Sequence, residues 1–254
     1  MSTPTEKQKD IYHLFRTYYT SEFVKTKLFL EAVKFRHFRF ELFSQHVRFE
    51  RIKDIFRKEE EVKAAISRIV PRNAYHTPVK WLNPIYVAKT KSEIDIMLSS
   101  PLYFDIDLDM KTVDNFGEAK DTLKELLAFI ETRFERKPDL VVFSGRKGFH
   151  VYYWKWDFDK MENLSPKERV ASFIRERKKI LFELEQSEIR VDPTVTADPY
   201  RLMKIPNTLH GKTGLIARPI FNLASFNPIA DCMAFDKNEY ERLFNFDLSY
   251  YDTR

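Results

Sequence analysis

Hydrophobic and polar positions follow two periods along the chain, and each period predicts a different kind of element. Apolar residues that recur every three or four positions predict amphipathic helices, at residues 5–30, 53–67, 114–133, 165–185 and 237–244. Alternating or wholly apolar stretches predict strands, namely a hairpin within residues 31–50 that turns around Ser44 and Gln45, and strands at 103–109, 140–143 and 151–154. Residues 92–98 predict a short helix or turn. The strand at 103–109 followed by a helix predicts a βαβ unit.

The stretch from Tyr103 to Asp109 carries a carboxylate at every second position. In a strand, successive side chains point to opposite faces, so Asp105 and Asp107 share one face while Ile106 points to the other. Carboxylates this close raise each other's pKa and are costly to bury unless a cation lies between them. Oxygen ligands suit Mg²⁺ or Mn²⁺, above all when substrate phosphates complete the coordination. The pattern favours a metal-dependent phosphoryl-transfer site. It is also compatible with a solvated sheet face, or with a glycosyltransferase that binds a metal and a nucleotide sugar.

A turn with two glycines follows the strand at 140–143. The glycines let backbone N–H groups approach an anion, and the side chains of Ser144, Arg146, Lys147 and His150 add further donors. The turn is therefore a candidate phosphate site, with an ordinary exposed hairpin as the alternative.

A third stretch combines one carboxylate with several basic side chains. Asp192 is followed downstream by Arg201, Lys204, His210 and Lys212. A triphosphate needs such basic neighbours, and a metal site built on the acidic strand needs a further acid.

Length and composition narrow these possibilities. The chain has 254 residues, 43% of them hydrophobic, which suits one α/β body built of two lobes. Its 43 Lys and Arg against 38 Asp and Glu give a net charge of +5, an excess that favours anionic partners. The single cysteine, Cys232, excludes an internal disulfide and a cysteine-rich zinc site. No apolar stretch approaches the ~20 residues of a membrane span, so we expect a soluble intracellular protein.

In their order and spacing, the three stretches resemble the catalytic small subunit of archaeo-eukaryotic DNA primases of the archaeal type. The matching motifs lie at residues 105–107, 144–150, 192 and 201–214. Upstream, residues 36–41 look like the family's Arg-Glu-Phe-x-Phe segment, with His37 in the glutamate position, and residues 71–75 are similar to another family stretch. The resemblance spans roughly residues 11–235.

The resemblance implies an α/β (α+β) fold in which mixed β-sheets are flanked by helices and the catalytic cleft lies between two sheets. It implies a single primase catalytic domain over residues 1–254. Family members usually carry a zinc module built from Cys and His, and one cysteine cannot build it, so neither the module nor zinc is expected.

The family's functional residues carry over only to positions that match its motifs. Its catalytic, metal-binding carboxylates, which would hold Mg²⁺ or Mn²⁺, correspond to Asp105, Asp107 and Asp192. Its contacts to the nucleotide correspond to Ser144, Arg146, Lys147, His150, Lys204 and His210, with Arg36 nearby. Asp109 and Asp198 match no family role and are expected to be structural or to support the metal ligands.

The resemblance implies a nucleotidyltransferase that synthesises short primers on single-stranded DNA from nucleoside triphosphates. The implied partners are the template, ribo- or deoxyribonucleotides, and a noncatalytic large subunit or its fused equivalent, with no membrane. The implied location is the cytoplasm, at the nucleoid. Two alternatives stay open: a primer-extending repair or translesion polymerase of the same superfamily, and a noncatalytic nucleic-acid-binding subunit. The three acids argue against the second, since a binding subunit has no use for mutually repelling groups.

Overall fold

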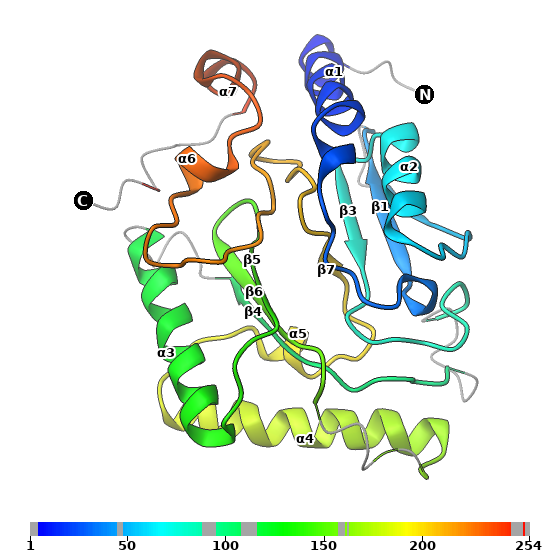
Figure 1. The fold of residues 1–254 in the computed structure, drawn as a ribbon, viewed down its shortest axis with the longest axis vertical. Coiled ribbons are helices and arrows are strands. Elements are labelled where there is room, and N and C mark those ends of the chain that lie inside the picture. The colour runs from blue at the N-terminus through cyan, green and yellow to red at the C-terminus, as the bar shows by residue number, and fades with distance from the viewer. Residues whose placement is uncertain are drawn as a thin grey trace.

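The computed structural model describes residues 5–44, 48–87, 95–107, 116–156, 161, 163–244 and 251. Figure 1 shows two small sheets with helices packed around them. This confirms the predicted combination of sheets and flanking helices, and every strand pair that the described residues form is antiparallel. The hairpin tip at Gln45, residues 92–94 of the predicted short helix or turn, and Asp109 lie outside the described residues. None of the described helices is long and apolar enough to span a membrane.

The first sheet has four strands in the order β2-β1-β3-β7. The strands span Phe38–Leu42 (β1), Arg48–Arg51 (β2), Asn73–His76 (β3) and Met203–Lys204 (β7). β1 and β2 form the predicted hairpin. β7 comes from the third sequence stretch and pairs with β3, where Lys204 lies opposite Tyr75. Residues far apart in the sequence therefore share this sheet.

Helix α1 (Glu6–Thr20) lies beside this sheet (Figure 1). It begins at Thr5, whose hydroxyl forms a reciprocal capping box with Gln8. The prediction that the helix reaches residue 30 is wrong. After Thr20 the chain forms a 3₁₀ turn at Phe23–Lys25, and Phe29 adopts a left-handed backbone with φ 58°, which a right-handed helix cannot pass through.

Helix α2 (Glu59–Ile69) lies next to α1 on the same side of the sheet (Figure 1). Three glutamates in its first turn complement the partial positive charge of a helix N-terminus. The predicted start at residue 53 is too early. Ile52 and Phe56 are instead buried in the core ahead of the helix, where they share a hydrophobic cluster with Phe38 and Val62.

The second sheet has three strands in the order β4-β6-β5. They span Leu102–Asp107 (β4), Leu140–Phe143 (β5) and Gly148–Tyr153 (β6). Since β6 is antiparallel to both neighbours, β4 and β5 run parallel to each other with β6 between them. The predicted βαβ unit is present with this third strand inserted. Helix α3 (Phe116–Phe134) connects β4 to β5 and buries one stripe of its surface, formed by Phe116, Ala119, Leu123, Leu126 and Ile130.

Helix α4 (Pro166–Gln186) runs below the second sheet in Figure 1. Ser165 and Glu168 form a capping box, and Pro166 occupies the first turn, as predicted. Among the basic residues of α4, Arg177 does not face solvent. Its guanidinium is fully buried and its Nη2 donates to the carbonyls of Ser100 (2.7 Å) and Pro101 (2.9 Å), which anchors the chain just before β4.

Three short helices complete the chain, α5 (Pro193–Thr196), α6 (Pro228–Cys232) and α7 (Lys237–Leu243). Helix α7 was predicted, whereas α5 and α6 were not, because four or five residues are too few for a helical period to show. The two sheets meet at an aromatic contact. The ring of His76 on β3 stacks on the ring of Tyr152 on β6, with centroids 6.3 Å apart.

Candidate active site

The acidic strand and the basic turn lie side by side because β4 pairs with β6. In this register Asp105 is opposite His150 and Asp107 is opposite Gly148. His150 Nε2 lies 3.7 Å from Asp105 Oδ1, and Lys147 Nζ lies 3.0 Å from Asp107 Oδ1. A Cβ at Gly148 would lie 1.6 Å from the carbonyl oxygen of Ile106, so only glycine allows the strands to approach here.

Asp192 joins this pair of strands from the third sequence stretch. Its backbone N–H donates to the carbonyl of Asp105 at 2.8 Å. Its side chain is the N-cap of α5 and accepts from Thr194 N (2.8 Å), Thr194 Oγ1 (2.6 Å) and Val195 N (3.2 Å). All three bonds end on Oδ1, which leaves Oδ2 as the oxygen available to a ligand. The structure therefore brings the three predicted acids to one end of β4.

The three carboxylates act on each other electrostatically. The pKa of Asp105 is raised to about 7, mainly by burial and then by the charges of Asp107 and Asp192, against the opposing effect of Arg201 and Lys147. Burial also raises the pKa of Asp192, but the hydrogen bonds from Thr194 and Val195 outweigh it and hold the pKa below its usual value. Asp105 is thus the carboxylate that gains most from a nearby cation.

The donor chemistry of the site fits a hard divalent cation. Asp105, Asp107 and Asp192 offer carboxylate oxygens, and the mutual repulsion of these acids is what a metal relieves. Within the described ranges, however, no three His, Cys, Asp or Glu side chains form a ready-made cage. The reason is local, because Asp107 turns to Lys147 and Asp192 commits one oxygen to its helix cap. This open arrangement suits a cation that shares its ligands with substrate phosphates.

The basic turn between β5 and β6 packs against the loop that carries His210. Ser144 N donates to the carbonyl of Gly148 at 2.9 Å, and the Thr213 hydroxyl donates to the carbonyl of Gly145 at 2.5 Å. Gly145 has φ +87°, and a Cβ there would lie 2.8 Å from the Cβ of His210. The second and third sequence stretches are therefore in direct contact.

Several nitrogens at this contact are available to an anion. Arg146 Nε and His150 Nδ1 are buried and, among the residues that the structure describes, have no hydrogen-bond partner. Burying such groups unpaired is unfavourable, so a ligand that pairs with them gains affinity. His210 Nδ1 accepts from Lys212 N at 3.3 Å, which leaves its proton on Nε2 as a donor.

The basic groups of this region act on one another across the two sheets. Burial, together with the charges of Lys204 and Arg201, lowers the pKa of His150 to about 3, so His150 is neutral near pH 7. Burial likewise lowers the pKa of His210 well below its ordinary value, and Lys204 and Arg146 add to the effect. Arg146, Lys204 and His210 thus converge on one place, as a triphosphate site requires.

Arg36, which was predicted to lie near the nucleotide, is placed in the interior. It is 3% exposed, and its guanidinium donates to the carbonyls of Glu31 (2.7 Å), Thr77 (3.0 Å) and Pro78 (2.8 Å). Its Cζ also lies 4.8 Å from the ring centroid of Trp154. These contacts account for an anchoring role beneath the site, and a contact to the nucleotide stays a prediction.

Sequence reasoning left Arg201 out of the predicted site, yet its charge acts on Asp105, Asp192 and His150. It lines a hollow of about 240 Å³ together with Phe49, Tyr75, Asp198, Tyr200 and Leu202. The sequence signal that could have indicated Arg201 is its position among the basic residues that follow Asp192. Asp198 has structural contacts, because its carbonyl accepts from the Tyr103 hydroxyl at 2.6 Å and its side chain caps Tyr200 N.

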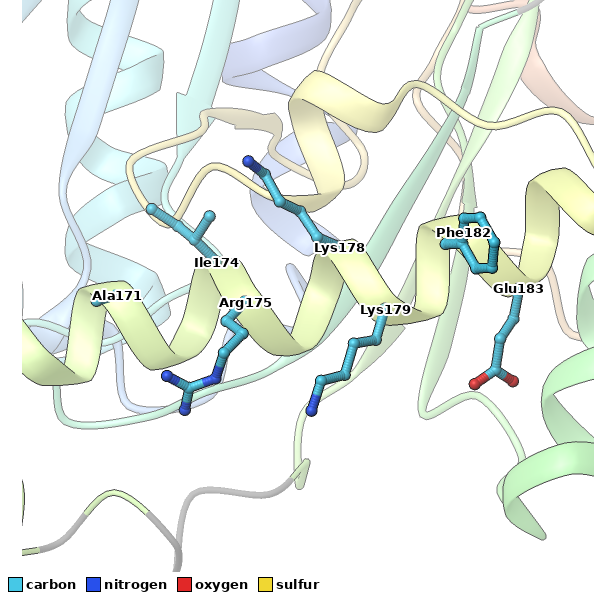
Figure 2. A pocket seen from close by; sticks show the side chains of 7 residues that line it. All are labelled: Ala171, Ile174, Arg175, Lys178, Lys179, Phe182 and Glu183. Carbon is cyan, nitrogen blue, oxygen red and sulfur yellow. The ribbon is translucent and has the colours of Figure 1, made fainter.

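Another hollow follows the surface of α4 and contains none of the predicted site residues. It is lined by Ala171, Ile174, Arg175, Lys178, Lys179, Phe182 and Glu183 (Figure 2). Figure 2 shows that all of these side chains project from the one helix, so they do not converge on a point as the groups around Asp105 do.

Comparisons with known proteins agree with this geometry. A sequence model of the DNA primase small subunit family matches residues 104–221, a range that includes every predicted site residue except Arg36. The DNA primase small subunit of Archaeoglobus fulgidus is 27% identical over 240 residues, covering 71% of each chain. That of Pyrobaculum islandicum is 26% identical over 249 residues, covering 81% of this chain and 76% of its own.

Among solved structures, the fold resembles the polymerase domain of ligase D from Mycobacterium tuberculosis in complex with DNA. The TM-score is 0.55 at 14% identity, and the match covers 93% of this chain and 88% of that one. At this identity the likeness concerns the fold. The family match and the archaeal relatives show that the chain is similar in sequence to the archaeal-type DNA primase small subunit.

Proposed function

We propose that this chain is the catalytic subunit of a DNA primase, which synthesises short primers on single-stranded DNA from nucleoside triphosphates. The relatives support a nucleotidyltransferase of the primase type. The observation that carries the proposal is the 2.8 Å hydrogen bond from Asp192 N to the Asp105 carbonyl. This bond places Asp192 at the acidic end of β4. Strand β4 also pairs with β6, which follows directly after the basic turn.

In this proposal the acids and the basic groups divide the reaction between them. Asp105, Asp107 and Asp192 would hold Mg²⁺ or Mn²⁺, whose charge, once bound, favours ionisation of the attacking hydroxyl and stabilises the leaving pyrophosphate. Ser144, Arg146, Lys147 and His150 would bind phosphates from the side of β6. Lys204 and His210 would bind them from the side of β7 and its following loop. Buried donors in fixed positions stabilise the charge that develops on the phosphates, because they need little rearrangement during the reaction.

The proposed domain organisation is one catalytic domain over residues 1–254 without a zinc module of its own. The proposed partners are a single-stranded DNA template and a noncatalytic large subunit, with which family members generally work. A replication enzyme of this kind would act in the cytoplasm, at the nucleoid.

A primer-free synthesis assay tests the proposal. We expect the chain, with Mn²⁺ or Mg²⁺ and single-stranded DNA, to form products that keep a 5′-triphosphate, and we expect Asp105→Ala to abolish them. The matched control is Asp121→Ala, because Asp121 is an exposed acid on α3 paired with Lys124. Extension of a supplied primer without any primer-free product would favour the repair or translesion polymerase instead. Unchanged synthesis by Asp105→Ala would contradict the proposal.

A further inference from the structure

Asn73 is a buried amide at the centre of a polar network on the first sheet. It lies on β3 opposite Glu41 of β1 and is 5% exposed. Its Nδ2 donates to Glu41 Oε2 at 2.6 Å, and its Oδ1 accepts from Lys204 Nζ and from Gly211 N, the latter at 3.0 Å. A carboxylate can only accept, whereas an ammonium and a backbone N–H can only donate, so these partners fix the orientation of the amide.

The first consequence of this network concerns Lys204. Lys204 is 3% exposed, and burial lowers its pKa well below the ordinary value, while the charge of Glu41 raises it. A buried ammonium is unfavourable unless acceptors meet it. Asn73 Oδ1 accepts the hydrogen bond of Lys204 without carrying a full negative charge. The negative charge that balances Lys204 is on Glu41, which is hydrogen-bonded to Asn73. Lys204 is thereby held in one position and keeps the capacity to bind a further anion.

The second consequence concerns the loop that carries His210. Gly211 N donates to Asn73, and Gly211 O accepts from Arg72 Nε at 3.2 Å, so its peptide groups are held from both sides. A Cβ at Gly211 would lie 2.4 Å from Arg72 Cγ and 2.7 Å from Asn73 Nδ2, so any side chain there would displace Arg72 or Asn73. Because Gly211 directly follows His210, this clamp fixes the backbone from which His210 projects.

The network also contains its own counter-charge. Arg72 Nη1 lies 3.6 Å from Glu41 Oε1, and Arg72 N donates to the carbonyl of Glu41 at 2.7 Å. The positive charge of Arg72 lowers the pKa of both Lys204 and His210. Glu41 is thus the counter-charge to both Arg72 and Lys204, and Asn73 is the side chain that bonds to Lys204 and to the His210 loop at once.

We propose that Asn73 is a positioning residue of the nucleotide site. It aligns Lys204 with the His210 loop, so that both meet the same triphosphate. This inference rests on the proposed function, because it takes Lys204 and His210 as the groups that bind the nucleotide. Asn73 acts through these groups and does not itself need to touch the nucleotide.

Substitutions at Asn73 separate this role from ordinary stability. Asn73→Ser removes the acceptor shared by Lys204 and Gly211. Asn73→Asp keeps the acceptor and the size but places a second carboxylate against Glu41, which repels it. The matched control is Asn227→Ser, because Asn227 is an exposed asparagine whose side chain caps α6 through Ile229 N and Ala230 N. All three variants are compared with the unsubstituted chain by thermal unfolding.

The decisive readout is binding of a nonhydrolysable nucleoside triphosphate, measured by titration calorimetry. Loss of one hydrogen bond to a charged group weakens binding by about tenfold or more. We therefore expect Asn73→Ser to bind the triphosphate about tenfold more weakly or worse. At saturating nucleotide we expect kcat to change by less than about threefold, since the acids are untouched. Asn73→Asp should bind more tightly than Asn73→Ser, because it still offers Lys204 an acceptor. Asn227→Ser should bind like the unsubstituted chain.

A double-substitution cycle tests whether Asn73 acts through Lys204. In a Lys204→Met background, Asn73→Ser should have a smaller effect on triphosphate affinity, because one of the two groups that Asn73 positions is gone. Equal effects in both backgrounds would overturn the inference, as would an Asn73→Ser protein that binds triphosphate normally. If such a protein still makes primers, the inference alone fails. If the unsubstituted chain binds no triphosphate, the proposed function fails with it.

Discussion

The two sides of the candidate site balance their charges in opposite ways. On the second sheet, Asp105 is surrounded by other acids, and its pKa rises to about 7 through burial and through Asp107 and Asp192. On the first sheet, Lys204 is buried more deeply, but Asn73 accepts its hydrogen bond directly and is itself bonded to Glu41. On the acidic side Lys147 pairs with Asp107 and leaves Asp105 subject to the repulsion of the other acids. On the basic side, by contrast, Asn73 and Glu41 offset the charge of Lys204.

This difference indicates what each side contributes. Repelling carboxylates are unfavourable in the metal-free protein, so the acidic side gains stability when a cation arrives. The basic side is already held together, so it can present a fixed set of donors to phosphates at little cost in rearrangement. The acidic side should therefore depend strongly on metal and pH, and the basic side on the integrity of its hydrogen bonds.

The largest effect is expected on the acidic side. Asp105→Asn keeps the shape of the side chain but removes its charge, so we expect primer synthesis to fall by about a thousandfold, in the range seen when a major electrostatic group is lost. The same change removes a carboxylate that its neighbours repel. The free energy of unfolding of the metal-free protein should therefore rise by about 1 kcal/mol at pH 8. Denaturant unfolding and product gels measure the two effects, with Asp121→Asn as control. Loss of both synthesis and stability would contradict the comparison.

A smaller loss is expected on the basic side. Lys204→Ala and His210→Ala should each weaken binding of a triphosphate analogue by about 10- to 100-fold, because a charge-assisted hydrogen bond is lost in each case. Fluorescence titration checks this, with Lys124→Ala as the control, because Lys124 is an exposed lysine on α3 that pairs with Asp121. If thermal unfolding shows that the unfolded fraction of each variant accounts for its loss of affinity, the two residues are structural.

The pH dependence of metal binding sharpens the contrast further. In the metal-free protein Asp105 binds its proton more tightly folded than unfolded, so its contribution to stability is greatest below about pH 4 and falls as the pH rises toward 7. Divalent cations compete with this proton. Adding Mn²⁺ should therefore raise Tm more at pH 8 than at pH 6, and the apparent affinity should fall by up to about tenfold between pH 7 and 6. An equal Tm gain at both pH values would show that Asp105 is not a ligand.

The smallest predicted effect concerns Arg201, which lies between the two sides. Its charge lowers the pKa of Asp105 and of Asp192. Arg201→Gln should therefore move the acid limb of the pH profile of synthesis to higher pH, and reduce kcat/KM at pH 7 by about three- to tenfold. Arg175→Gln, at an exposed position on α4, is the control. An unshifted profile would remove Arg201 from the site.

Much of this arrangement was predictable because its signals are local. Strict alternation around Asp105 predicted β4, an apolar run predicted β5, and apolar residues every three or four positions predicted α4. The ordered motifs also named the residues that meet at the site. Their meeting, however, depends on one backbone bond between Asp192 and Asp105, which no period in the sequence encodes.

The remaining features depend on contacts made only in the folded chain. The burial of Arg36 and Arg177 was missed because a basic side chain that donates to backbone carbonyls leaves no pattern distinct from one in solvent. Asn73 was likewise missed, since its partners lie on β1, on β7 and in a loop. Helix α5 was not predicted because it is a single turn, even though Asp192 is a residue type that commonly caps a helix N-terminus.

A crystal soaked with Mn²⁺ and a nonhydrolysable nucleoside triphosphate tests the central claim most directly. The account predicts anomalous scattering peaks coordinated by Asp105, Asp107 and Asp192, with the triphosphate reaching Lys204 and His210. Manganese bound elsewhere, or bound without Asp192, would contradict it.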